Sequence, residues 1–273
     1  MEVSAQALYQ LCLRASREVR RRYDYRRVEP VGLSCKEDGS PVTEADLRAG
    51  EVLVAGLERL APGVPVVSEE TSWPPDSVRR GWSEYWLVDP LDGTREFISG
   101  SSQFSINVAL VRGGSAELGV IYLPLTGEMY CGGRQAAPLL YRGGQVRKVR
   151  PRIASRGDAL KLIHSRAGGE HPRMDVLKER LREQGFELLV ERRGSAWKFC
   201  RLAEGGAHLY PRYGSTREWD TAAGQAMLEA VGGRVVDVKG QALRYNTHRQ
   251  LMNPPFFAFG PADFDWCAVL GLG

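Results

Sequence analysis

The stretch Trp86-Leu87-Val88-Asp89-Pro90-Leu91-Asp92-Gly93-Thr94 decides how this 273-residue chain is interpreted. An apolar run from Tyr85 to Val88 predicts a strand, and two carboxylates follow it closely. In α/β sheets, ligands bind beyond the carboxyl ends of the strands. Proline fixes φ and glycine permits a tight bend, so the following loop should be stiff. Two acids on a stiff loop predict an oxygen site suited to Mg²⁺. The alternative is a turn in which Asp89 and Asp92 only bond nearby amides.

The bulk composition is that of an ordinary globular protein. Hydrophobic residues make up 43% and charged residues 26% of the chain, and its length allows one large domain or two modest lobes. No apolar run approaches the roughly 18–20 residues that span a bilayer. The N-terminus lacks the pattern of a signal peptide. We therefore expect a cytoplasmic protein without a membrane span.

Cysteine content and charge argue against a zinc-binding protein and against a nucleic-acid-binding protein. The five cysteines are scattered, without a CxxC pair or a zinc-ligand spacing, which favours reduced thiols. The formal net charge of +4 is mild. The basic run from Arg20 to Arg27 lacks the length and the interleaved aromatic residues of a single-strand binding groove, so we expect a solvated helix end and no nucleic-acid partner. Charge supports only a weak bias toward anionic small molecules.

Hydrophobic periodicity places helices and strands in the first half of the chain. Residues from about Ser4 to Arg22 predict an amphipathic helix. A second helix starts near Thr43 and ends at Pro62-Gly63, and Leu47 is expected on its buried side. The other expected elements of this half are four strands and a surface loop, namely Val64–Val67, Phe104–Val111, Leu118–Tyr122, Glu128–Cys131 and the loop Trp73–Gly81.

Strands and helices alternate in the second half. The polar stretch from Arg142 to Arg152 marks a boundary, so we expect an α+β lobe over residues 1–150 and an α/β lobe over residues 151–273. The expected elements of the second lobe are, in chain order, strand Lys161–His164, helix Met174–Gln184, strand Glu187–Val190, helix Ala196–Glu204, strand Ala207–Pro211 and helix Thr221–Ala230.

Two acids upstream of the decisive stretch have both a chemical and a structural interpretation. Glu69 follows a predicted strand, and two strand tips in one sheet would bring it close to Asp89 and Asp92. Otherwise it is a solvated acid at the start of a loop. Asp46 fits a capping box with Thr43, which explains the motif without any catalytic role.

Asp220 has the same ambiguity. It stands just before a helix that begins with the small residues Ala222-Ala223-Gly224, and as an N-cap it would bond the first free amides. The functional alternative is a metal ligand with Trp219 packed behind it. The small residues would let the helix approach a neighbouring element or a ligand closely.

Four motifs occur in one order along the chain: Val42-Thr43-Glu44-Ala45-Asp46, Ser68-Glu69-Glu70, Asp89-Pro90-Leu91-Asp92-Gly93-Thr94 and Trp219-Asp220-Thr221-Ala222-Ala223-Gly224. Together, from about Lys36 to the C-terminus, the chain resembles the Mg²⁺-dependent, lithium-sensitive inositol monophosphatase superfamily. The resemblance implies a layered sandwich that mixes α+β and α/β character, with alternating α-β-α-β-α layers. This is the inositol monophosphatase-like sugar phosphatase fold.

Within the superfamily, the chain is most similar to the bacterial 3′(2′),5′-bisphosphate nucleotidases of the CysQ type, in the four stretches Tyr85–Phe97, Gly194–Cys200, Ala203–Tyr213 and Glu218–Gly224. This implies hydrolysis of the 3′-phosphate of 3′-phosphoadenosine 5′-phosphate to AMP and phosphate, and activity on 3′-phosphoadenosine 5′-phosphosulfate. The partner would be a small phosphorylated nucleotide, and a homodimer stays open. The alternatives are a phosphatase of inositol monophosphate or fructose 1,6-bisphosphate, and an inactive protein that senses the nucleotide. Because every acid position is filled, the sequence disfavours the inactive protein.

The resemblance also implies roles for single residues. Two or three Mg²⁺ ions would be held by four carboxylates and one carbonyl, from Glu69, Asp89, Leu91, Asp92 and Asp220. The attacking water would be oriented and deprotonated by Asp46 and Thr94 together with Glu69. The substrate would be bound by Gly93, Thr94, Ser195, Lys198, Arg212 and Asp220. The stretch Ser165–His171 departs from the family pattern because its histidine is displaced.

Overall fold

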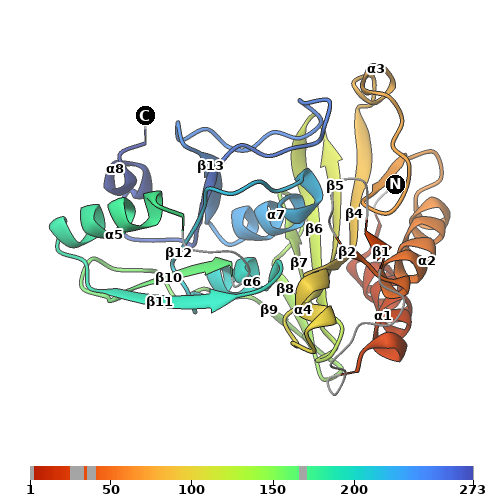
Figure 1. The fold of residues 1–273 in the computed structure, drawn as a ribbon, viewed down its shortest axis with the longest axis horizontal. Coiled ribbons are helices and arrows are strands. Elements are labelled where there is room, and N and C mark those ends of the chain that lie inside the picture. The colour runs from red at the N-terminus through yellow and green to blue at the C-terminus, as the bar shows by residue number, and fades with distance from the viewer. Residues whose placement is uncertain (1–2, 25–33, 36–40, 166–170, 273) are drawn as a thin grey trace.

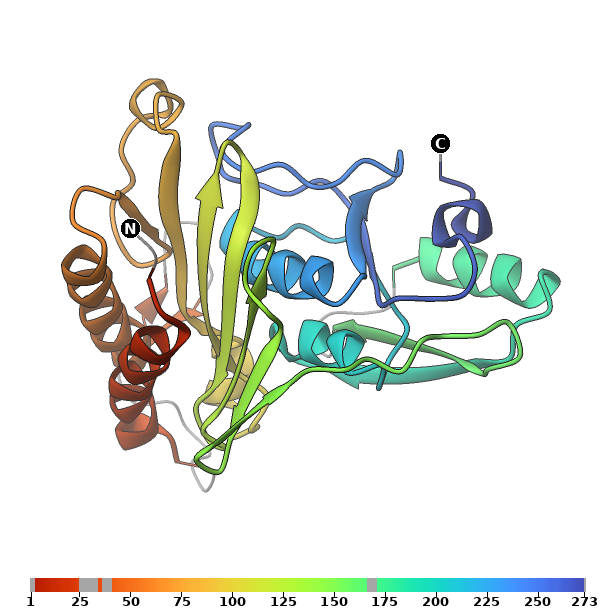
Figure 2. The same ribbon diagram turned by 180° about the vertical axis from the view of Figure 1, so that it is seen from behind.

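Layers of helices and sheets alternate through the molecule in a computed structural model that describes residues 3–24, 34–35, 41–165 and 171–272 (Figures 1 and 2). Two helices cover one face of a large sheet, two more lie between this sheet and a smaller one, and a third pair covers the outer face of the smaller sheet. The expected α-β-α-β-α sandwich is therefore confirmed.

The larger sheet has seven strands in the order β3-β4-β5-β6-β7-β8-β9. β3 and β4 are parallel, and all later neighbours are antiparallel. The strands are β3 Val66–Ser68, β4 Glu84–Asp92, β5 Ser105–Arg112, β6 Ser115–Leu123, β7 Glu128–Gly133, β8 Leu139–Arg142 and β9 Gln145–Lys148.

The smaller sheet has five strands in the order β11-β10-β12-β14-β13. β10 is parallel to both of its neighbours, whereas β14 is antiparallel to β12 and β13. The strands are β10 Leu160–Ser165, β11 Leu188–Arg193, β12 Leu209–Arg212, β13 Arg234–Asp237 and β14 Phe256–Phe259. A separate two-stranded ribbon consists of β1 Ser34–Cys35 and β2 Pro41–Val42.

The helices divide among the three layers. The outer layer on the large sheet is α1 Ala5–Arg22 and α2 Glu44–Leu60, the middle layer is α6 Trp197–Ala203 and α7 Ala222–Ala230, and the layer on the small sheet is α5 Arg173–Glu183 and α8 Trp266–Leu270. Three short helical segments carry connections, namely α3 Asp76–Arg79, α4 Thr94–Ile98 and the 3₁₀ turn η1 Glu218–Asp220. No helix in the described ranges is both long and apolar enough to cross a bilayer.

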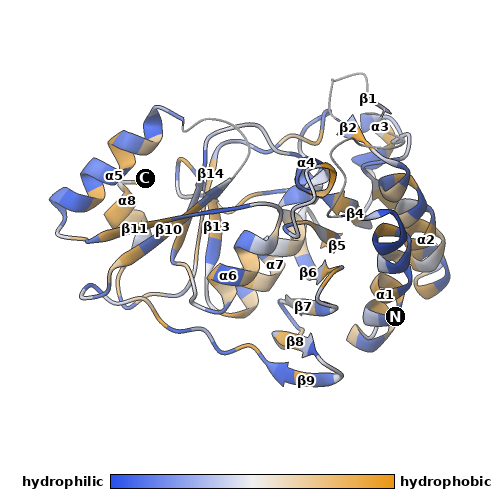
Figure 3. Cartoon of the chain, turned by 60° about the horizontal axis from the view of Figure 1, so that its bottom comes forward, coloured by the Kyte–Doolittle hydropathy of each residue, from blue (hydrophilic) through white to orange (hydrophobic). Residues whose placement is uncertain are grey.

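The outer helices are amphipathic, and both hydrophilic and hydrophobic residues run along α1 and α2 in Figure 3. Leu8, Leu11, Ala15 and Val19 of α1 are buried at the spacing that the sequence predicts. Ser4 caps α1 by accepting a hydrogen bond from the Ala7 amide at 3.2 Å. The helix boundaries therefore follow from local sequence.

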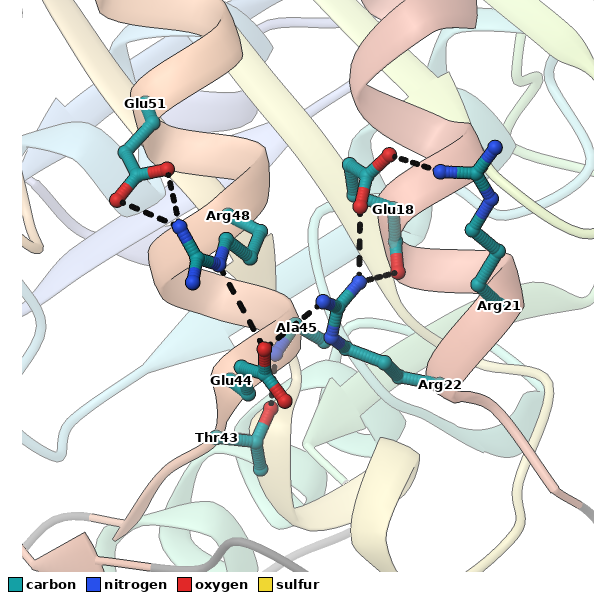
Figure 4. A network of polar contacts seen from close by, with 8 residues as sticks. All are labelled: Glu18, Arg21, Arg22, Thr43, Glu44, Ala45, Arg48 and Glu51. Atoms are coloured by element: carbon teal, nitrogen blue, oxygen red, sulfur yellow. Dashed lines mark hydrogen bonds and ion pairs between the residues drawn. The ribbon is translucent and has the colours of Figure 1, made fainter.

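A polar network joins the C-terminal end of α1 to the N-terminal end of α2 (Figure 4). Arg22 lies 2.9 Å from both Glu18 and Glu44, and Arg48 pairs with Glu44 and Glu51. Glu44, Arg48 and Glu51 are more than half exposed, so water screens their attraction and these pairs contribute little to stability. The two helices are held mainly by their buried apolar faces.

The middle helix α7 contacts its neighbour α6 and the large sheet at close range, as its small residues predict. A Cβ atom on Gly224 would lie 2.2 Å from the ring of Phe199 in α6. On the other side, a Cβ atom on Gly119 of β6 would lie 2.1 Å from the carbonyl oxygen of Ala223. Both distances are far shorter than van der Waals contact, so only glycine fits at either position.

Several expectations about local structure are wrong. Leu47 is 44% exposed, because the buried side of α2 is set by Leu53 and Leu57. The segment Trp73–Gly81 is not only a surface loop, since it contains α3 and the buried side chain of Arg79. The polar stretch after Arg142 continues the large sheet as β9.

Other elements were not expected at all. β13, β14 and α8 lie in the last 40 residues, for which the sequence pattern predicts no element. The division of the chain at residue 150 stays a prediction. α7 belongs to the second half of the chain but packs on β5, β6 and β7 of the large sheet. The four cysteines whose side chains are described are free thiols, as expected.

Replacing Gly224 by alanine tests the close packing of α7. The added methyl group clashes with the Phe199 ring, so we expect the free energy of unfolding to fall by about 1–3 kcal/mol in urea denaturation. Gly157→Ala is the matched control, because a Cβ atom there meets nothing within 4 Å. Equal stability of the two variants would contradict the packing described here.

Candidate active site

Three carboxylates converge where β3, β4 and η1 meet. β3 and β4 are parallel with Ser68 opposite Val88, and the amide of Glu69 donates to the Val88 carbonyl at 3.0 Å. Glu69 therefore lies beside Asp89, as the two strand tips predict. η1 packs on β4 and β5 and brings Asp220 to the same place. One carboxylate oxygen from each of these three acids lies within 4.8 Å of the other two.

The electrostatics of this cluster favour a bound cation. Burial and the charges of Glu69 and Asp92 raise the pKa of Asp89 well above its usual value. Burial, with Asp92 and Glu69, also raises the pKa of Asp220 to about 8, although the Arg217 amide donates to its carboxylate at 2.8 Å. An all-oxygen donor set with concentrated negative charge suits a hard divalent ion. The residues present therefore fit a metal site.

Asp92 lies at the edge of the cluster rather than within it. Its Oδ2 accepts from Asn107 Nδ2 at 3.2 Å, from Ser105 Oγ at 3.4 Å and from the Ala196 amide. The pairing of β4 with β5 shifts register between Asp89 and Asp92, at a bulge that accommodates a proline in an internal strand. The structure thus places Asp92 near the three acids, but its role as a metal ligand stays a prediction.

The chain just after Asp89 is held by local hydrogen bonds. The amide of Leu91 donates to Asp89 Oδ1 at 3.0 Å, and the Leu91 carbonyl lies 3.2 Å from Thr94 Oγ1. These contacts fix the direction of the carbonyl that the sequence expects to bind a metal. That role, too, stays a prediction.

Asp46 combines the two roles that the sequence leaves open. Its Oδ2 accepts from the Thr43 amide at 2.8 Å and from the Thr43 hydroxyl at 2.5 Å, and this completes the capping box of α2. Its Oδ1 lies 3.1 Å from Thr94 Oγ1. Burial raises the pKa of Asp46, while the hydrogen bonds from Thr43 and Thr94 oppose that rise. The cap leaves one carboxylate oxygen directed at Thr94.

A pocket of about 190 Å³ opens beside the cluster. Five of the six residues expected to bind substrate line it, namely Gly93, Ser195, Lys198, Arg212 and Asp220. The sixth, Thr94, follows Gly93 at the start of α4 and is not part of the lining. Asp220 belongs both to the carboxylate cluster and to the pocket wall, so the two features form one site.

The cationic wall of the pocket is built on unusual local geometry. Ser195 has φ of +51°, a left-handed conformation that a serine rarely adopts. Lys198 is buried and donates to the Ser195 carbonyl at 2.6 Å, with its ammonium 5.0 Å from the centre of the Tyr210 ring. Arg212 Nη1 donates to Ser165 Oγ at 2.6 Å. The local strain is located where the substrate is expected to bind, as is common at functional sites.

One expectation about the site is wrong, and another concerns residues outside the described part of the chain. Asp220 does not cap α7, because the N-cap of α7 is Thr221 and the Asp220 carboxylate accepts from the amide of Arg217 instead. The 3₁₀ turn moves the helix start by one residue. Of the stretch Ser165–His171, residues 166–170 lie outside the described part of the chain.

Several residues of the site were not predicted from the sequence. Arg95, Ser165 and Thr216 line the pocket, and Asn107 donates to Asp92. A polar Asn107 within the apolar strand β5 is a usable signal, because a buried amide needs a partner. The other three carry no signal of their own, since arginine, serine and threonine are ordinary residues at loops and element ends.

Comparison with known proteins identifies the family. The model of the inositol monophosphatase family matches residues 1–258. The 3′(2′),5′-bisphosphate nucleotidase CysQ of Escherichia coli strain K12 is 41% identical over 244 residues, which are 85% of this chain and 90% of that protein. The Haemophilus influenzae protein of the same name is 34% identical over 239 residues, 88% of this chain and 87% of its own.

A solved structure agrees with these matches. The crystal structure of CysQ from Bacteroides thetaiotaomicron, described as a bacterial member of the inositol monophosphatase family, superimposes with a TM-score of 0.80 at 31% identity. The match covers 95% of this chain and 99% of that one. The family model and the relatives agree over nearly the whole chain, and the chain belongs to the inositol monophosphatase family.

Proposed function

We propose that this protein is a metal-dependent 3′(2′),5′-bisphosphate nucleotidase. It hydrolyses the 3′-phosphate of 3′-phosphoadenosine 5′-phosphate to AMP and phosphate, and it also accepts 3′-phosphoadenosine 5′-phosphosulfate. The proposal rests on one observation above all, the shared position of Asp220 in the carboxylate cluster and in the pocket that Lys198 and Arg212 line. The likeness to the CysQ proteins supports the choice of substrate.

The proposed cofactor is Mg²⁺, two or three ions, held by Glu69, Asp89, Asp220, Asp92 and the Leu91 carbonyl. The first three acids converge, and Leu91 follows Asp89 so closely that its amide donates to the Asp89 carboxylate. Bound Mg²⁺ would neutralise the phosphate oxygens, acidify the attacking water and stabilise the leaving oxygen. The oxygen-only donor set supports magnesium rather than a softer metal.

The chain's own contribution to the chemistry is to hold and deprotonate water. Thr94 Oγ1 lies 3.1 Å from Asp46 Oδ1, so the hydroxyl can pass a proton to the carboxylate while its oxygen accepts one from water. Capping by Thr43 fixes the other Asp46 oxygen, which orients the pair. Glu69, which lies beside Asp89 in the carboxylate cluster, completes the proposed set.

The second phosphate of the substrate distinguishes a bisphosphate nucleotide from a simple monophosphate. Lys198, Arg212 and Ser195 lie on the pocket wall, and a cationic wall suits an anionic group. The ammonium of Lys198 donates to the Ser195 carbonyl at 2.6 Å, and because an ammonium carries three N–H donors it can also donate to a phosphate. The homodimer and the cytoplasmic location stay predictions from the sequence.

Phosphate release from a panel of substrates tests the proposed function. With Mg²⁺ present, we expect 3′-phosphoadenosine 5′-phosphate to be cleaved with a far higher kcat/KM than inositol 1-phosphate, fructose 1,6-bisphosphate or AMP. Lys198→Ala should raise KM for the bisphosphate nucleotide more than for any monophosphate. Preference for an inositol or fructose phosphate would contradict the proposed substrate. No phosphate release from any compound would favour an inactive protein that only binds the nucleotide.

The double role of Asp46 predicts different outcomes for two substitutions. Asp46→Asn removes the proton acceptor, so turnover should fall by roughly 10²–10⁴-fold. Thr43→Ala removes the cap and should lower the free energy of unfolding by about 1 kcal/mol with much smaller loss of turnover. Steady-state kinetics and urea denaturation measure both. Near-normal turnover of Asp46→Asn would restrict Asp46 to helix capping.

The raised pKa values of Asp89 and Asp220 predict how pH and metal act together. In the metal-free protein the folded state binds more protons than the unfolded state from the usual 3.8 up to about 8, so its stability should fall as pH rises through this range. Metal binds the deprotonated acids, so the rise in Tm on adding Mg²⁺ should be larger at pH 8 than at pH 6. Thermal melts at matched ionic strength measure this.

Asp220→Asn is the control for this measurement. The variant loses one of the three converging carboxylates, so its Tm should respond weakly to Mg²⁺ at both pH values. An equal Tm response of the wild-type protein at pH 6 and pH 8 would contradict the proposed protonation of the cluster.

A further inference from the structure

Arg79 is a buried charged residue outside the substrate pocket, and its guanidinium joins the segment 74–79 to the segment 246–249. Its Nε donates to the Pro74 carbonyl at 2.9 Å, Nη1 to Asn246 Oδ1 at 2.9 Å and Nη2 to the Arg249 carbonyl at 2.8 Å. The Asn246 amide group returns a hydrogen bond to the Arg79 carbonyl at 2.6 Å. Arginine suits this position because its planar fork offers several donors in fixed directions.

Asn246 also contacts η1, the turn that carries Asp220. Its backbone amide donates to both carboxylate oxygens of Glu218, at 2.9 and 2.8 Å. Asn246 has φ of +59°, a conformation that asparagine tolerates better than most residues. Glu218 is buried, lies two residues before Asp220 in η1 and accepts from the Tyr85 hydroxyl of β4 at 3.5 Å.

The segment that carries Arg79 is also connected to Glu69. Trp73 Nε1 donates to the carbonyl of Ser68, the residue before Glu69, at 2.9 Å. The chain then runs directly through Pro74 to α3 and Arg79. Trp73 also packs edge-on against Trp219, with ring centres 5.0 Å apart, between the two acid-bearing segments. A continuous set of contacts therefore links Glu69 to Asp220 behind the carboxylate cluster.

We propose that Arg79, Asn246 and Glu218 form a clamp that sets the distance between Glu69 and Asp220 and thereby the affinity of the site for its metal. They are positioning residues: among the described residues that line the substrate pocket, none belongs to the clamp. The clamp holds the two acids at metal-binding distance before a cation arrives. This inference rests on the proposed function.

Metal binding measured without turnover tests the clamp. Mn²⁺ alone, followed through the electron paramagnetic resonance signal of the free ion, titrates the metal-free protein and two variants. Asn246→Gly keeps the left-handed backbone and removes the contacts to Arg79, and Arg79→Lys keeps the charge but loses the fork. We expect each to raise the dissociation constant by about 10-fold or more, with kcat recovering near its wild-type value at saturating Mg²⁺.

Leu177→Ala in α5 is the control, because it removes a buried side chain from the far side of the small sheet. It should lower Tm without changing Mn²⁺ affinity. If both clamp variants bind Mn²⁺ as tightly as the wild type while their Tm falls, the contacts are only structural and the inference is overturned. If the wild-type protein itself binds no Mn²⁺, the proposed metal-dependent function fails instead.

Discussion

Oxygens of Glu69, Asp89 and Asp220 lie within 4.8 Å of one another, and the folded chain has to hold these acids together although their charges repel. Much of the architecture can be understood from this constraint. β3 and β4 are parallel neighbours with a fixed register, so two of the acids leave adjacent strands side by side. The third arrives on a 3₁₀ turn that packs on the same sheet. Removing such acids from water raises their pKa values. A bound divalent cation would offset both the repulsion between the carboxylates and the loss of their hydration.

The layered fold supplies the rigidity that this arrangement needs. The seven-stranded sheet is covered on both faces, by α1 and α2 on one side and by α6 and α7 on the other (Figure 1). The acids therefore stand on a covered and well-packed sheet. The cationic wall of the pocket comes from the other half of the chain, through Ser195, Lys198 and Arg212. The two halves meet at Asp92, whose carboxylate accepts from the Ala196 amide.

Local patterns in the sequence predict the parts of the structure that local interactions decide. The ends of α1 and α2, most strands and the proximity of Glu69 to Asp89 follow from periodicity, capping residues and strand tips. Parts decided by distant contacts were missed. Arg79 is buried against Asn246 and Arg249, which lie 167 and 170 residues further along the chain, so no local pattern predicts its burial. Of the two interpretations of Asp220, the helix cap was wrong, because a 3₁₀ turn and a helix start look alike in sequence.

The close approach of α7 to both sheets has a consequence for how the protein folds. Phe199 fills the space beside Gly224, and Ala223 touches Gly119 on the large sheet, so one helix completes the hydrophobic core of both sheets. Neither sheet can bury its inner face without this segment. α7 therefore belongs to the core that lies between the two sheets. A fragment ending near residue 150 would expose the apolar face that α7 covers. The small sheet also needs β14, so the protein should gain its structure cooperatively once the chain has been synthesised through residue 259.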